Sequence, residues 1–376
     1  MLYISKFATS QTKSFSQVAH HNIKSLMTQR VNFELRAQDH VLNWNEAPSW
    51  NSEAATYFAK TKSDMSCALV HLLPADLLRC VYRDKNKAIG LTAFETTKIP
   101  DWIAGGYNEN YKALIVPSDY NKRALERSGV TIPVRVVPHA IGEWWQKDYE
   151  PLPEKDDTYV FGFAGFWNSR KNPMTLLKAY VEAFPEPSDN QSLLLKTFQA
   201  GDVEGYVQSL CGQARPDIWI YNEEWTEEQM LWGFQLMDCY VSAHKGEAFG
   251  LTLAQAAALG KPTAYTNFSA PTEWLDTNAH YPIPYDLVSV GAEDLKPGYD
   301  HLETASLDWA DVNFQDLVVQ LRELAETKPR SGFRGEALSD FRERIHWRSV
   351  GKALVDAVED VMDCKLQRLS STEESQ

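Results

Sequence analysis

Two adjacent cations, Arg170 and Lys171, stand in the loop "FWNSRK" (166–171), just before an expected helix start near residue 172. The apolar run "YVFGFAG" (159–165) precedes this loop and predicts a buried strand. Two positive side chains beside the free N–H groups of a helix start can bind a diphosphate. The alternative is that both are solvated charges at the edge of a loop.

A carboxylate follows a second expected strand. Glu247 lies in the turn "KGEAFG" (245–250), after the apolar run "DCYVSAH" (238–244) and before the helical segment "LTLAQAAAL" (251–259). Glu247 is therefore expected at the carboxyl end of a strand, where open α/β sheets bind their ligands. Gly250 would let the backbone come close to that ligand.

Short apolar runs alternate with longer amphipathic segments, which indicates parallel α/β architecture with two doubly wound sheets. The expected strands are 67–73, 112–118, 134–139, 159–165, 192–198, 217–222, 238–244 and 262–267. Helices are expected over 172–184, 226–237 and 347–364, and Thr226 and Gln229 have the spacing of a capping box.

The chain has 376 residues, of which 44% are hydrophobic and 23% charged. This balance is typical of folded globular proteins, and the length suits two domains of roughly 150–200 residues with a cleft between them. The segment "GEWWQKDYEPLPEKDD" (142–157), with its prolines and mixed charge, is the best candidate linker. It divides the chain near residue 150.

Several features favour a cytoplasmic protein. No apolar run approaches the roughly 20 residues that span a bilayer, and the first residues lack the apolar centre of a secretory signal. The cysteines are odd in number, and their spacing indicates neither a disulfide framework nor a zinc site: Cys67, Cys80, Cys211, Cys239 and Cys364. The net charge of −14 disfavours nucleic acid as a partner.

Four segments, in order, resemble retaining glycosyltransferases of the GT-B fold, in the large group called "glycosyl transferases group 1" (GT4-like). They are "GLTAFETTKIPDWI" (90–103), "ALIVPSDYNKRALERSGVTIPVRVVPHAI" (113–141), "FAGFWNSRKNPMTLLKAYVEAF" (163–184) and "KGEAFGLTLAQAAALGKPTAYTNFSAPTEWL" (245–275).

The resemblance implies two Rossmann-like, doubly wound parallel-sheet domains that face a central cleft. Residues 1–150 are then expected to form the acceptor-side domain, and residues 151–345 the domain that binds the nucleotide sugar. Residues 346–376 would add a C-terminal helix, packed back toward the N-terminal domain, and a polar tail.

The resemblance also implies roles for particular residues. Glu247 matches the acid that contacts the hydroxyls of the transferred sugar, and Lys171, with Arg170 beside it, matches the cation that neutralises the diphosphate. An arginine is common directly after the strand glycine in this family, but this chain has Phe166 there. The expected donor-binding residues are Gly165, Trp167, Ala248, Phe249, Gly250, Leu251 and Gln255. For Trp167, core packing is the alternative to stacking on a sugar or base.

Gln255 stands where the family usually has a second acid that holds the ribose hydroxyls. A neutral amide accepts weaker hydrogen bonds than a carboxylate, so the resemblance implies lower nucleotide affinity or a different hold on the ribose. The alternative follows from spacing alone: Thr252 and Gln255 are three residues apart, as in a capping box, so Gln255 would only cap its own helix.

Three residues in the N-terminal half are candidates on the acceptor side. Glu95 follows an apolar run, and its alternative is an ordinary acid at a helix start. His139 ends an expected strand, and its alternative is a structural, hydrogen-bonded histidine. Ser16 lies in the segment "SFSQVAHHNIKSL" (14–26), which replaces the glycine-rich first loop common in the family.

These observations predict a metal-independent glycosyltransferase without a cofactor, because no DxD pair is placed to hold a metal. Its donor would be a nucleoside diphosphate sugar, with a UDP-sugar favoured, and its acceptor a glycan, a lipid-linked glycan or a small molecule. One alternative is a phage-type enzyme that glucosylates hydroxylated DNA bases. Another is a non-catalytic GT-B protein that binds a sugar nucleotide or stabilises a partner.

Overall fold

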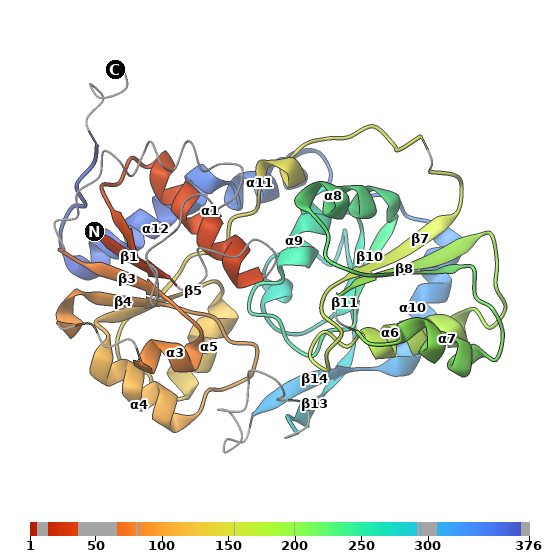
Figure 1. Ribbon diagram of the computed structural model, residues 1–376, viewed down its shortest axis with the longest axis horizontal. Coiled ribbons are helices and arrows are strands. Elements are labelled where there is room, and N and C mark those ends of the chain that lie inside the picture. The colour runs from red at the N-terminus through yellow and green to blue at the C-terminus, as the bar shows by residue number, and fades with distance from the viewer. Residues whose placement is uncertain are drawn as a thin grey trace. The chain divides into compact units, whose positions relative to one another are not determined.

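The computed structural model describes residues 1–5, 14–36, 66–79, 82, 84–153, 155–198, 200–291, 294 and 307–369 (Figure 1). The polar tail expected at residues 370–376 lies outside these ranges. The chain divides into two compact units. Unit 1 contains the described residues of Met1–Gly142 and Glu343–Gln376, and unit 2 those of Glu143–Asp300 and Leu307–Arg342.

Unit 1 is built on a six-stranded parallel sheet of order β2-β1-β3-β4-β5-β6. Its strands are β1 (Leu2–Ser5), β2 (Glu34–Arg36), β3 (Ala68–His71), β4 (Ala88–Leu91), β5 (Ala113–Val116) and β6 (Val134–Val136). Its helices are α1 (Ser14–Thr28), α3 (Pro74–Arg79), the 3₁₀ turn η2 (Lys85–Lys87), α4 (Asp101–Asn110), α5 (Asp119–Arg127) and α12 (Trp347–Met362).

Helices from the two ends of the chain cover one face of this sheet. Apolar side chains of α1, such as Ile23, and of α12, such as Leu354, share one buried cluster with Leu69 and Ile115 of the sheet. Helices α3, α4 and α5 lie on the opposite face (Figure 1). The C-terminal helix is therefore part of the core of unit 1.

Unit 2 is built on a second six-stranded parallel sheet, of order β12-β11-β10-β7-β8-β9. Its strands are β7 (Tyr159–Ala164), β8 (Gln191–Thr197), β9 (Ile218–Asn222), β10 (Cys239–Ser242), β11 (Thr263–Thr266) and β12 (Tyr281–Ile283). Counted from β7, this is the doubly wound order that binds nucleotides where the strand order reverses, here between β7 and β10.

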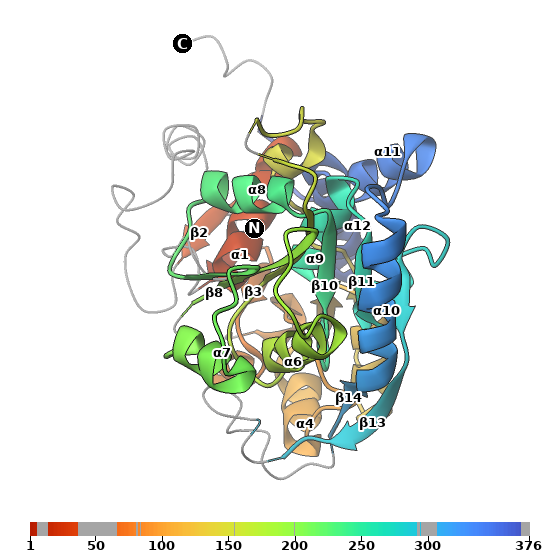
Figure 2. The same cartoon turned by 90° about the vertical axis from the view of Figure 1, so that its right-hand side faces the viewer.

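Short helices and one hairpin complete unit 2. The helical elements are η3 (Glu143–Gln146), α6 (Pro173–Ala183), α7 (Val203–Cys211), α8 (Glu227–Leu236), α9 (Leu251–Ala258), η4 (Ala270–Glu273), α10 (Phe314–Thr327) and α11 (Gly335–Arg344), whose last residues fall in unit 1. Strands β13 (Tyr285–Ser289) and β14 (Asp308–Val312) pair antiparallel. Helices α6 and α10 pack side by side over one apolar cluster (Figure 2).

The prediction of an α/β protein with two parallel sheets is confirmed, and all eight predicted strands form. The capping box of α8 is also present, since the Thr226 hydroxyl and the Gln229 side chain each accept a backbone N–H of the other residue. The patterns did not predict β1, β2, β4 and β12, which have three or four residues each, or β13 and β14, which have five. No helix among the described ranges is long and apolar enough to cross a membrane.

Candidate functional site

Two loops meet at the carboxyl ends of the neighbouring strands β7 and β10, where the strand order of unit 2 reverses. The first loop connects β7 to α6 and carries Arg170 and Lys171. The second connects β10 to α9 and carries Glu247. Because β7 and β10 pair directly, side chains that are 76 positions apart in sequence become neighbours. This strand edge is where doubly wound sheets bind their ligands.

Local chemistry shapes the first loop. At Gly165 an added Cβ would lie 2.9 Å from the ring of Phe163, so a side chain there would force a shift. The Asn168 side chain accepts the N–H of Lys171 at 2.9 Å. Asn172 adopts the left-handed conformation (φ 52°), and Pro173 then begins α6 with the backbone angle that a first helical turn needs.

The two loops are hydrogen-bonded to each other. The N–H of Lys245 donates to the carbonyl of Arg170 at 2.7 Å, and the Arg170 guanidinium donates to the carbonyl of Gly246 at 2.8 Å. The indole N–H of Trp274 donates to the carbonyl of Phe249 at 3.2 Å. The loop that carries Glu247 is therefore fixed by contacts from several directions.

Glu247 forms a buried ion pair with both predicted cations. Its side chain contacts the ammonium of Lys171, and its Oε1 lies 3.4 Å from Nη1 of Arg170, while the residue is only 5% exposed. Burial alone would raise the pKa of Glu247, but the charges of Lys171, Arg170 and His244 outweigh it and lower the pKa to about 2. The alternative that both cations are simply solvated is wrong.

Helix α9 begins differently from the capping-box alternative. Gly250 is its N-cap in the left-handed conformation (φ 86°), and Leu251 is its first residue. Thr252 is therefore inside the helix, and its hydroxyl is hydrogen-bonded to that of Tyr240 at 2.8 Å. The proposal that Gln255 pairs with Thr252 as a cap is wrong. Gln255 lies one turn into the helix and is 6% exposed.

The remaining donor-side candidates separate into two groups. Ala248 and Phe249 are buried in the turn before α9, next to Glu247. Trp167, by contrast, is partly buried against the apolar cluster of unit 2, which supports its packing role. Phe166, which stands where the family often has arginine, is 37% exposed and meets the ring of Phe198 edge-on at 6.2 Å.

The acceptor-side candidates lie in unit 1. Glu95 is half-buried in the loop after β4, six residues before α4 begins at Asp101, so the helix-start alternative is wrong. Its loop is held because Asn121 bonds both the N–H and the carbonyl of Phe94, at 2.7 and 2.8 Å. Ser16 is 2% exposed in α1, which places its hydroxyl away from solvent.

His139 belongs to a histidine group in unit 1 in which His71 is buried and His21 and His139 are partly buried. Burial, followed by the charge of His21, lowers the pKa of His139 to about 3. His21 accepts the indole N–H of Trp347 at 3.0 Å, and His71 is hydrogen-bonded to the Tyr3 hydroxyl at 3.1 Å. These contacts and low pKa values favour neutral, structural imidazoles.

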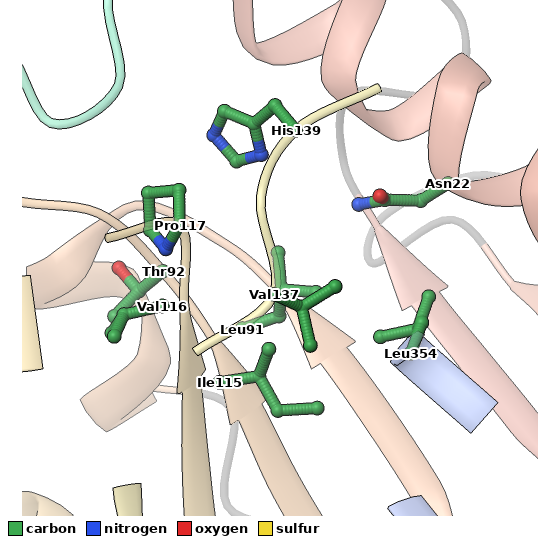
Figure 3. Close-up of a pocket in the computed structure, with 9 residues that line it drawn as sticks. All are labelled: Asn22, Leu91, Thr92, Ile115, Val116, Pro117, Val137, His139 and Leu354. Carbon is green, nitrogen blue, oxygen red and sulfur yellow. The ribbon is translucent and has the colours of Figure 1, made fainter. Parts of the chain in front are cut away.

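His139 also lines a small cavity at the carboxyl ends of β4 and β5 (Figure 3). Its volume, about 10 Å³, leaves room for the centre of roughly one water molecule. Among the described residues, the amide nitrogen of Asn22 finds no hydrogen-bond partner there. A single water fits this cavity, whereas a sugar does not.

Two residues that shape this site were not predicted from the sequence patterns. Ser269 bonds the backbone of Glu247, and Asn168 orders the cation loop. Both lie inside the segments that resemble the glycosyltransferase family. Their residue types are common in loops, and only their three-dimensional contacts distinguish them.

No protein-family model and no curated protein sequence matches the chain. Solved structures do match. Sucrose-phosphate synthase from Thermosynechococcus elongatus has a TM-score of 0.65 and 13% identity, over 96% of this chain and 98% of that one. HepE from Anabaena, in complex with UDP-glucose, has a TM-score of 0.63 and 9% identity, over 96% and 99%. TarM has a TM-score of 0.56 and 10% identity over 79% of this chain, which spans only 55% of TarM.

These neighbours are glycosyltransferases of the GT-B fold, and they cover most of the chain. The chain therefore has the GT-B fold, as its sequence predicted. At these identities the likeness defines the architecture, and the site must be interpreted from its own residues.

Proposed function

We propose that this protein is a retaining, metal-independent glycosyltransferase that uses a nucleoside diphosphate sugar, in the first place a UDP-sugar. The proposal rests on one observation: Arg170, Lys171 and Glu247 contact one another at the edge of unit 2 where the strand order reverses, between β7 and β10. Two cations and one carboxylate are the groups that a sugar diphosphate requires. The UDP-glucose bound to HepE, which shares the fold, supports a uridine nucleotide as donor.

In this proposal the ion pair opens when the donor binds. The phosphate oxygens replace the Glu247 carboxylate as the partners of Lys171 and Arg170. The carboxylate of Glu247 then accepts hydrogen bonds from hydroxyls of the sugar. As the bond between the anomeric carbon and the phosphate oxygen breaks, its electron pair passes to the diphosphate. The cations stabilise this growing charge more in the transition state than in the ground state.

Transfer with retention completes the reaction on one face of the sugar. The acceptor oxygen bonds to the anomeric carbon on the side that the phosphate leaves, and the acceptor proton passes to a departing phosphate oxygen. In this scheme unit 2 binds the donor and unit 1 the acceptor, with Glu95 as its candidate contact. A glycan, a lipid-linked glycan or a small molecule supplies the hydroxyl.

The test is release of UDP from a panel of UDP-sugars, with and without simple sugar acceptors, followed by NMR of the anomeric proton in the product. We expect UDP release and a product of the same anomeric configuration as the donor. Lys171→Ala should lower turnover by about 100-fold or more, because its charge acts on the leaving group. Lys178→Ala, an exposed lysine on α6, is the matched control and should keep full activity.

The outcomes also separate the alternatives. UDP binding without UDP release from any donor would favour the non-catalytic sugar-nucleotide-binding protein. Transfer to DNA that contains hydroxymethylated bases, and to no sugar acceptor, would favour the DNA-modifying enzyme, against which the net charge of −14 argues.

A further inference from the structure

Ser269 holds a backbone conformation that is rare for any residue with a side chain. It lies between β11 and η4 with φ 63° and ψ −158°, a region that is essentially restricted to glycine. A residue in such a region costs folding free energy, and it persists where its surroundings require it. Glycine would be free of this strain, so the serine side chain must contribute something that glycine lacks.

The hydroxyl of Ser269 contacts the backbone of Glu247. Its Oγ accepts the N–H of Glu247 at 2.9 Å and donates its own proton to the carbonyl of Phe268 at 2.6 Å. The N–H of Ala270 donates to the carbonyl of Glu247 at 3.2 Å. Residues 269 and 270 therefore bond Glu247 on both its amide and its carbonyl side.

Buried neighbours keep this arrangement in one orientation. Nε2 of His244 lies 3.3 Å from the carbonyl of Phe268, and because a carbonyl only accepts, Nε2 carries the proton. Nδ1 then accepts the hydroxyl of Ser242 at 3.0 Å. The Thr272 hydroxyl donates to the carbonyl of Ser269 at 2.8 Å, which fixes the other side of the strained residue.

We propose that Ser269 is a positioning residue for Glu247, an inference that rests on the proposed glycosyltransferase function. When a donor takes Lys171 and Arg170 away from the carboxylate, Glu247 loses the ion pair that anchors its side chain. From then on its carboxylate is placed mainly by its backbone, which Ser269 holds. The strain at Ser269 is maintained because the hydroxyl fixes this carboxylate toward the sugar.

The experiment compares Ser269→Gly, Ser269→Ala and the wild type. Glycine relieves the strain and removes the hydroxyl, whereas alanine keeps the strain and removes the hydroxyl. We expect kcat for the best UDP-sugar to fall at least about 10-fold in both variants, with UDP affinity changed less than about twofold, because the diphosphate is held by Arg170 and Lys171. Ser269→Gly should nevertheless melt at a higher temperature than Ser269→Ala.

Lys328→Gly is the matched control for strain relief. Lys328 is exposed at the end of α10 with φ 45°, so glycine there should raise thermal stability and leave kcat unchanged. A Ser269→Gly variant with a raised melting temperature and full kcat would overturn the proposal, since the serine would then be only a strained structural residue.

Hydrogen exchange provides a readout that does not depend on activity. Amides of residues 245–250 should exchange at least about 10-fold faster in both Ser269 variants than in the wild type and in Lys328→Gly. Unchanged exchange would overturn the proposal even if activity fell. A wild type that neither binds UDP nor turns over any donor would refute the proposed function instead, and the exchange result would still decide whether Ser269 holds Glu247.

Discussion

Replacing Glu247 with glutamine should destabilise the protein and, at the same time, tighten its binding of UDP. The carboxylate is 5% exposed, and its pKa of about 2 lies below the ordinary value of 4.5. At 1.36 kcal/mol for each pKa unit, the folded state favours the ionised carboxyl over a neutral one by about 3 kcal/mol, which sets the scale of the stability that a neutral amide would lose. For a unit of this size the loss corresponds to a fall in melting temperature of roughly 6–12 °C.

The gain in affinity has the same cause. In the proposed donor site of the wild type, UDP must compete with Glu247 for the two cations, and in Glu247→Gln it would not. We expect UDP to bind about 5–30-fold more tightly, which corresponds to 1–2 kcal/mol. Turnover should nevertheless fall, because the amide is a poorer acceptor for the hydroxyls of the sugar.

The assay combines thermal unfolding with isothermal titration of UDP. The control is Glu326→Gln, an exposed acid on α10, which should change neither quantity. Saturating UDP should restore more of the melting temperature in Glu247→Gln than it adds to the wild type. If the substitution left both the melting temperature and the UDP affinity at wild-type values, the ion pair would have no part in stability or donor binding.

Three further outcomes are expected. Activity should persist in excess chelator, and a loss that magnesium or manganese restores would contradict the metal-free mechanism. Gln255→Glu should tighten UDP binding by up to about 1–2 kcal/mol if this side chain contacts the ribose. Titration with UDP and thermal unfolding test this, and a lower melting temperature at constant UDP affinity would mean that the Gln255 side chain belongs only to the core. The free energy of unfolding, measured with urea, should fall as the pH drops from about 6.5 toward 4. Wholly or partly buried neutral histidines stay unprotonated in the folded state but take up a proton when unfolded, which costs about 1–2 kcal/mol each by pH 5. Constant stability from pH 7 to pH 5 would contradict the lowered pKa values, which are about 3 or 4 at His21, His71, His139, His244 and His280.

The strands that the sequence predicted are those with enough apolar residues to be distinguished from loops. Strand β8, with "QSLLLKT", shows a clear run, but β2, with "ELR", and β4, with "AIGL", are short and contain charged residues or glycine. Gly90 in β4 makes room for the packed side chain of Leu114, since an added Cβ would lie 2.8 Å from it. Such strands are determined by tertiary pairing, which a single sequence does not display.

The site was predictable to the extent that strand order places it. Arg170, Lys171 and Glu247 each follow an apolar strand, and parallel strands end at one edge of a sheet. Spacing alone was misleading at Thr252, because the left-handed Gly250 is the N-cap and α9 starts two residues earlier than the capping pattern implies. Ser269 was not predictable, because its strained angles arise only when the loops after β10 and β11 meet.

The most direct test of the proposed donor site compares the UDP affinity of the wild type with that of the Arg170→Ala, Lys171→Ala double variant. Uridine, which lacks the diphosphate, is the control ligand. We expect UDP to bind the wild type, more weakly as salt concentration rises, and to bind the folded double variant at least about 100-fold more weakly. Uridine should bind both proteins equally and weakly. Equal UDP affinity in the two proteins, or no binding of UDP to the wild type, would contradict a nucleotide-sugar site at these residues.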